Sequence, residues 1–191
     1  MTIRQRLAFA ALALIAALFV AAPASAELDA SGDWPQADVA PLAPEIESAS
    51  PFALTEVGEG TAEPVRADVR FFPAPGASAG DPAPAVVLLH GAGGVGRARE
   101  LRYARQFAAQ GVAAAVIDVF APRGGGGFVE RLMKTTEAMA LADAFATLEW
   151  LDGRADIDAS RVALIGFSYG GMSAVYAAYA QVVETYGATR P

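Results

Sequence analysis

Three continuous apolar runs, separated by stretches with helical periodicity, constrain the fold of this chain more than any other feature. The runs are residues 85–89, 112–119 and 162–167. A strand that is apolar on both sides is typical of a parallel sheet buried between two layers of helices. Helices are expected over 97–110, from the 123–127 loop to Leu151, and from the end of the third run through 174–185. This order predicts an α/β fold with a mostly parallel sheet and helices on both faces.

The rest of the sequence fits a single domain preceded by one extended segment. Of the 191 residues, 54% are apolar, which suffices for one core. Residues 65–71 alternate apolar and polar side chains and predict a half-buried strand, so the folded domain is placed at 65–191. Residues 27–64 are rich in Pro and acidic residues, which predicts an extended segment with one short strand around 52–57.

Residues 1–26 have the parts of an export signal. Arg4 and Arg6 form a basic start, residues 7–22 are apolar and uncharged, and a small-residue cleavage pattern ends at Ala26. Cleavage is predicted after Ala26, with the mature protein periplasmic or secreted. The apolar run is shorter than the ~20 residues of a membrane-spanning helix. No stable membrane insertion is therefore expected after cleavage.

Charge and side-chain inventory argue against several classes of function. Without residues 1–26 the chain has 12 basic and 21 acidic side chains, a net charge of about −9, which argues against nucleic acid as a partner. The sequence has no Cys and one His. Neither a disulfide nor a Cys/His metal site is expected, and no cofactor is predicted.

The turn after the third apolar run carries the pattern Gly-x-Ser-x-Gly, at Gly166, Ser168 and Gly170. Between a buried strand and a helix, this pattern is typical of a nucleophile elbow, a sharp turn that exposes a Ser hydroxyl. Gly is needed on both sides because the backbone is crowded there. Ser168 is therefore predicted to be a catalytic nucleophile, which needs a base, oriented by an acid, to take its proton.

A turn of small residues follows the first apolar run, from His90 through Gly91 to Gly94. Its backbone N–H groups can bind an oxyanion together with the N–H of Tyr169, the residue after the predicted nucleophile. In this architecture the base follows the nucleophile in the chain, whereas His90 precedes Ser168. His90 is therefore predicted to fix the loop rather than to act as the base.

Two alternative interpretations remain open for the loops that follow the first and second apolar runs. Gly91, Gly93 and Gly96 also form the pattern Gly-x-Gly-x-x-Gly between a strand and a helix, which would predict a dinucleotide-binding oxidoreductase. Arg123 lies in the loop after the second apolar run, where ligands bind in open α/β folds. It either faces a substrate carboxylate or carbonyl, or forms a salt bridge that anchors the loop.

Four motifs follow one another in order, at residues 84–91, 103–111, 117–124 and 160–171. Together they resemble the dienelactone hydrolase family of the α/β-hydrolase superfamily. The resemblance implies an α/β-hydrolase fold and a small-molecule substrate, a carboxylic ester or lactone cleaved through an acyl-enzyme. It implies Ser168 as the nucleophile and the N–H groups of Ala92 and Tyr169 as the oxyanion hole. It also implies that Arg123 lies near the site.

The sequence departs from that family in two respects. Members have a Cys nucleophile and an acidic residue in the oxyanion loop, where this chain has Ser168 and Gly91, so a broader esterase is expected. The family's catalytic Asp and His lie on later strands, whereas the residues after Ser168 include one acid, Glu184, and no His. We therefore expect a domain truncated after the nucleophile helix, with the strand at 162–167 on the sheet edge and the Asp and His beyond residue 191. A catalytically inactive relative is the alternative.

Overall fold

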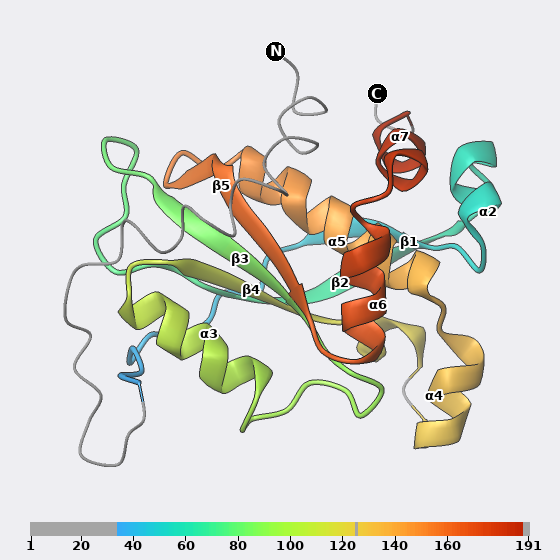
Figure 1. Ribbon diagram of the computed structural model, residues 1–191, viewed down its shortest axis with the longest axis horizontal. Coiled ribbons are helices and arrows are strands. Elements are labelled where there is room, and N and C mark those ends of the chain that lie inside the picture. The colour runs from blue at the N-terminus through green and yellow to red at the C-terminus, as the bar shows by residue number, and fades with distance from the viewer. Residues whose placement is uncertain (1–33, 125, 189–191) are drawn as a thin grey trace.

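The computed structural model describes residues 34–124 and 126–188 (Figure 1). Its centre is a five-stranded sheet with the strand order β1-β2-β4-β3-β5. The strands are β1 (Ile46–Ser50), β2 (Glu63–Phe72), β3 (Ala83–Leu89), β4 (Ala113–Asp118) and β5 (Ile157–Gly166). The helices are α2 (Leu54–Glu59), α3 (Glu100–Ala109), α4 (Phe128–Lys134), α5 (Glu137–Asp152), α6 (Tyr169–Tyr176) and α7 (Ala180–Ala188), with a 3-10 turn η1 (Ala121–Arg123). The predicted export signal and its cleavage site lie outside the described residues.

Three strands pair in parallel and form the predicted centre of the sheet. β3 lies between β4 and β5, while β2 pairs antiparallel with β4 and β1 pairs antiparallel with β2. Val87, Leu88 and Leu89 of β3 are all fully buried. Since successive side chains of a strand point to opposite faces, both faces of β3 are covered. The predicted α/β fold is confirmed, and among the described strands β5 lies on the edge of the sheet.

Alternate side chains of β3 enter two different cores. Val87 and Leu89 pack in the same core as Ala144 of α5, whereas Leu88 packs in the same core as Ala104 of α3. α3 and α5 therefore cover opposite faces of the sheet, and α6 packs beside α5 (Figure 1).

This arrangement creates a topological switch point at β3 and β5. The chain leaves β3 for α3 on one face and leaves the neighbouring β5 for α6 on the other. Where adjacent parallel strands lead to helices on opposite faces, their loops diverge and open a crevice at the carboxyl ends of the strands. The two small-residue turns, after β3 and after β5, lie at these ends of the strands, where the general rule places a ligand.

The structure corrects the predicted elements in three places. The short strand expected around 52–57 is wrong, because this segment forms α2 and the strand lies earlier, at β1. The helical stretch expected up to Leu151 is two helices, α4 and α5. Thr135 and Thr136 separate them in extended conformation, which suits β-branched side chains. The helix expected through 174–185 is likewise divided into α6 and α7.

A buried ion pair ties β1 to α5. The Asp143 carboxylate accepts hydrogen bonds of 2.7 and 3.0 Å from Arg123 and one of 2.6 Å from Ser48 of β1. The remaining N–H groups of Arg123 bind the carbonyl oxygens of Val119 and Ala49 and the hydroxyl of Ser50. Burial raises the pKa of the Asp143 carboxyl, and the hydrogen bonds from Arg123 and Ser48 oppose that shift. All five guanidinium donors are thus used inside the protein.

Replacing Asp143 by Asn is expected to destabilise the fold strongly. Arg123 would keep its charge in a buried site without a counter-charge, and the loss of one partner of a buried ion pair costs about 3–5 kcal/mol. Urea unfolding followed by circular dichroism measures the change in the free energy of unfolding. The control, Glu45→Gln, removes an exposed partner of Arg66 and should cost less than about 1 kcal/mol. Equal losses in the two variants would contradict the anchoring role.

Candidate functional site

Ser168 lies on the turn between β5 and α6, in a backbone conformation that few residues adopt. Its φ is 52° and its ψ is −112°. Among the described residues it is the one non-Gly residue with positive φ. A residue held in such a region is strained by about 1–3 kcal/mol. The side chain is exposed, as expected of a turn that presents a hydroxyl at the end of a sheet.

Two glycines allow this turn by close backbone contact. A Cβ on Gly170 would lie 2.5 Å from the carbonyl oxygen of Leu89 and 2.7 Å from that of His90. A Cβ on Gly166 would overlap the backbone of Gly170. Phe167 N–H donates to the Leu89 oxygen and Gly170 N–H to the His90 oxygen, both at 3.1 Å. The turn after β5 is therefore fastened to the end of β3.

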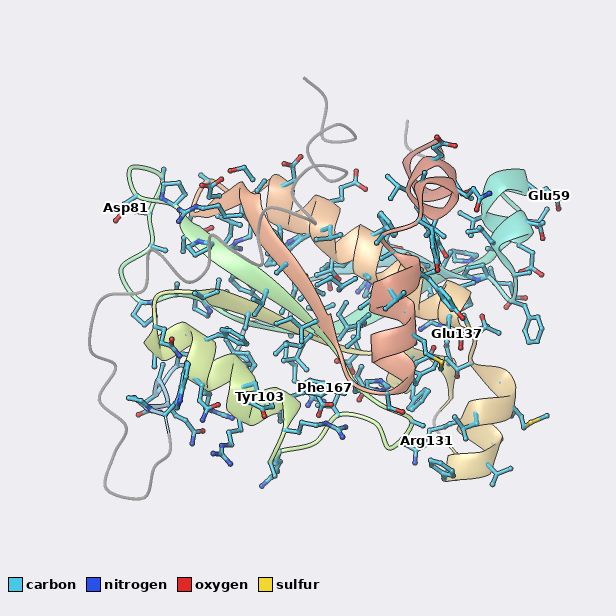
Figure 2. All side chains as sticks on the ribbon, viewed as in Figure 1. Glu59, Asp81, Tyr103, Arg131, Glu137 and Phe167 are labelled. Atoms are coloured by element: carbon cyan, nitrogen blue, oxygen red, sulfur yellow. The ribbon has the colours of Figure 1, made fainter. Side chains whose placement is uncertain are left out.

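The ring of Phe167, the residue before Ser168, is held by α3. It stacks on Tyr103 with 5.7 Å between ring centroids and 10° between planes. The guanidinium of Arg99 lies over the same ring, 5.2 Å from its centroid. Figure 2 shows Tyr103 and Phe167 side by side next to the end of β5. The elbow is thus held from the α3 face of the sheet as well as from α6.

The loop after β3 passes directly beside Ser168. A Cβ on Gly91 would lie 3.1 Å from the carbonyl oxygen of Phe167 and 3.5 Å from the Cβ of Ser168. Ala92 and Tyr169 line the same pocket as Ser168. Tyr169 begins α6, and the first backbone N–H groups of a helix have no intrahelical acceptor. The structure therefore brings the predicted oxyanion-hole residues and the predicted nucleophile together.

His90 is fully buried, and both of its ring nitrogens have partners. The backbone N–H of Val119 lies 3.0 Å from Nε2. Because a backbone N–H can only donate, Nε2 accepts, and Nδ1 carries the proton that is donated to the carbonyl oxygen of Gly91 at 2.7 Å. The ring also packs on Phe120, 4.5 Å between centroids. This geometry gives His90 a structural role between the oxyanion loop and the end of β4.

The pocket beside Ser168 has a volume of about 390 Å³. Its lining is mostly apolar and comes from four segments of the chain: Phe52, Ala92, Leu132, Met133, Thr135, Thr136, Glu137, Ser168, Tyr169 and Met172. Glu137 is the one charged side chain among these residues. Such a pocket offers an apolar group of a ligand a place to bind within reach of the Ser168 hydroxyl.

The hydroxyl of Tyr169, a residue of the pocket wall, is held by a hydrogen bond. It donates a 2.6 Å hydrogen bond to the carbonyl oxygen of Thr136, just before α5. Burial raises the pKa of the Tyr169 hydroxyl, and the negative charge of Glu137 adds to that shift. The phenol therefore stays protonated and keeps its hydrogen bond over the physiological range of pH.

The substrate-binding role considered for Arg123 is corrected by the structure. Its five N–H donors all bind the protein, and its side chain is 6% exposed. No donor is left for a substrate, and Arg123 is not among the residues that line the pocket. The anchoring alternative is the one that the geometry supports.

The geometry also speaks against the dinucleotide site at Gly91, Gly93 and Gly96. Where the pattern would place a pyrophosphate, at the start of α3, a carboxylate of the chain itself is bound. Gly96 N–H donates to Glu100 at 2.7 Å, and Glu100 is fully buried and pairs with Arg99 at 2.6 Å. A pyrophosphate at this helix terminus would meet a buried negative charge.

Most of the pocket wall could not be found from the sequence. Phe52 belongs to a segment expected to be extended, and Glu137 falls in the middle of a stretch expected to be one continuous helix, whereas it is the first residue of α5. The apolar spacing of Leu132 and Met133 with residues 128 and 129 indicates a helix with one apolar face. Nothing in that spacing says that this face lies beside Ser168.

Two structural features are absent from the described part of the chain. No helix there is long and apolar enough to cross a membrane. Within the same residues, no group of three or more His, Cys, Asp or Glu side chains is arranged to hold a metal ion.

The mixed sheet with its parallel centre, the topological switch point and the strand–turn–helix at Ser168 are those of the α/β-hydrolase fold. Among protein families, the X-Pro dipeptidyl-peptidase family (S15 family) matches residues 60–185. This match covers well over half of the chain, so the protein belongs to the S15 family, which is a family of hydrolases. A comparison with curated protein sequences gave no match.

Two solved structures share the fold. One is a dienelactone hydrolase-like promiscuous phosphotriesterase from metagenomic libraries, 24% identical, with a TM-score of 0.53 over 76% of this chain and 55% of the other. The second is a puromycin-hydrolysing peptidase from Mycobacterium tuberculosis, 24% identical, with a TM-score of 0.51 over 73% of this chain and 20% of the other. The chain thus spans about half the length of the first and a fifth of the second. The expected resemblance to dienelactone hydrolases is confirmed at the level of the fold.

Replacing Gly170 by Ala is expected to break the contact between the elbow and β3. The new Cβ would meet two carbonyl oxygens of the backbone, which cannot move aside as a flexible side chain can. We expect a loss of at least about 3 kcal/mol in the free energy of unfolding, or no folded protein. The control is Gly93→Ala in the neighbouring loop, where a Cβ meets nothing within 4 Å. Urea unfolding compares the two, and a stable Gly170→Ala variant would contradict the close contact.

Proposed function

We propose that the protein is a serine hydrolase that cleaves carboxylic esters or lactones through an acyl-enzyme, with Ser168 as the nucleophile. The observation that carries the proposal is the strained backbone of Ser168, an exposed residue beside a mostly apolar pocket. Strain of this kind persists only where the surrounding structure over-determines it, and it clusters at active sites. Membership of a hydrolase family supports the proposal.

In the proposed reaction the hydroxyl oxygen of Ser168 attacks the carbonyl carbon of the substrate, and a base takes the hydroxyl proton. The carbonyl oxygen becomes an oxyanion, which accepts hydrogen bonds from the N–H groups of Ala92 and Tyr169. Collapse of this intermediate breaks the bond to the leaving alcohol, which takes up the proton, and leaves the acyl group on Ser168. Water then attacks the acyl-enzyme, releases the carboxylic acid and restores the hydroxyl.

The base in this scheme is not His90. Its Nε2 already accepts a hydrogen bond from Val119 N–H, and its Nδ1 proton is bound to the carbonyl oxygen of Gly91. To take a proton from Ser168, the ring would have to break one of these bonds inside the core. A different group must therefore act as the base.

The pocket supports a small substrate. Ligand pockets for small molecules have volumes of about 300–1,000 Å³ and mostly apolar walls, and the pocket beside Ser168 has about 390 Å³. We also propose, from the pattern of residues 1–26, that the mature protein acts in the periplasm or outside the cell.

Covalent labelling tests the nucleophile. The protein produced from its intact gene is expected to react with a fluorophosphonate probe, and mass spectrometry should find the adduct on Ser168. Labelling should disappear in Ser168→Ala and persist in Ser160→Ala, which removes an exposed Ser that does not line the pocket. Labelling of the Ser168→Ala variant to the same extent would contradict the proposal.

A second variant tests the structural role of His90. In His90→Leu the N–H of Val119 and the carbonyl oxygen of Gly91 lose their partner, which should lower the free energy of unfolding by about 1–3 kcal/mol. The protein that remains folded should still react with the fluorophosphonate at Ser168. A variant that is folded by circular dichroism but does not react at all would contradict this prediction.

A further inference from the structure

We propose that Glu137 determines the charge selectivity of the pocket, so that the hydrolase prefers substrates whose pocket-bound group carries a positive charge and rejects those with a carboxylate. The inference rests on the proposed function, because it names the substrate class for the Ser168 site. It starts from the composition of the pocket wall, in which one carboxylate stands among apolar and neutral groups.

The charge of Glu137 acts within the wall of the pocket that also contains Ser168. Both Glu137 and Ser168 line the pocket, and the charge of Glu137 contributes to the raised pKa of the neighbouring Tyr169 hydroxyl. Figure 2 shows Glu137 at the start of α5, in the region between α6 and α4. A group bound in the pocket therefore experiences the field of this carboxylate.

No cation of the described chain neutralises Glu137. Within residues 34–124 and 126–188 its carboxylate has neither an ion pair nor a hydrogen-bond donor as a partner. The basic side chains nearest along the chain are engaged elsewhere. Lys134 pairs with Glu130 at 2.6 Å, and the guanidinium of Arg131 lies over the ring of Phe120.

The position of Glu137 on its helix has a simpler explanation, which the experiment must separate from ours. An acidic residue in the first turn stabilises a helix through the helix dipole, and Glu137 is the first residue of α5. That role requires no ligand and predicts no selectivity among substrates. It predicts only that removing the charge lowers the stability of the protein.

The decisive substrates are three aryl esters of matched size, whose acyl chains end in a trimethylammonium, a tert-butyl or a carboxylate group. The first two have nearly the same shape and differ in charge. For the wild-type protein we expect kcat/KM to be about tenfold higher for the ammonium ester than for the tert-butyl ester, and lower still for the carboxylate ester. Added salt should reduce these differences, because the pocket is open to water.

In Glu137→Gln the three values of kcat/KM should converge. Glu137→Asp should retain the order of preference. Glu184→Gln, which removes the same charge from an exposed position of α7 outside the pocket, should leave all three values unchanged. A charge preference that is unchanged in Glu137→Gln would overturn the inference, and so would the absence of any preference in the wild type.

Binding separates this inference from the proposed function. The three parent carboxamides, which lack a reactive ester, are titrated calorimetrically into Ser168→Ala and into the Ser168→Ala, Glu137→Gln double variant. Tighter binding of the ammonium amide that depends on Glu137 supports the inference, whether or not Ser168 is the nucleophile. Equal binding of the three amides to Ser168→Ala overturns it, even where fluorophosphonate labelling supports the proposed function.

Discussion

The site depends on one backbone contact, the approach of Gly170 to the carbonyl oxygens at the end of β3. β3 and β5 pair in parallel up to Leu89 and Gly166, and the chain must then turn into α6 without moving away from its neighbour. A side chain at position 170 would push the turn off β3. The distance from Ser168 to the loop that carries Ala92 would then grow, and the two would no longer border one pocket.

The strain at Ser168 is balanced by contacts from both layers of helices. On one face, the ring of Phe167 contacts Tyr103 of α3 and Arg99, the residue before α3. On the other, the Tyr169 hydroxyl binds the carbonyl oxygen of Thr136 at the start of α5. The residues before and after Ser168 are thus fixed to different sides of the sheet. A backbone held at both ends can keep a conformation that costs about 1–3 kcal/mol.

The parts of the structure that follow local rules could be predicted from the sequence, and those that follow distant contacts could not. The apolar runs predict buried strands, because burial on both faces of a sheet restricts the residue type. The glycines around Ser168 predict the sharp turn, because its crowded backbone does the same. α2 formed where a strand was expected, since Val57 packs in one core with α5 and α7 residues far along the chain. For the same reason the sequence could not distinguish the substrate-binding role of Arg123 from the anchoring role, because its partner Asp143 lies 20 residues away.

The buried ion pair and the pocket are parts of one arrangement. Asp143 lies less than two helical turns after Glu137 on α5, so Arg123 helps to fix the helix whose first turn forms the pocket wall. The hydroxyl of Thr136 binds the carbonyl oxygen of Pro51, which holds the segment of Phe52 against the same helix start. All N–H donors of Arg123 are bound inside the protein, whereas Glu137 lines the pocket. The charge that faces a substrate is therefore negative. The two charges therefore have different roles. Arg123 stabilises the pocket wall, and Glu137 interacts with the bound ligand.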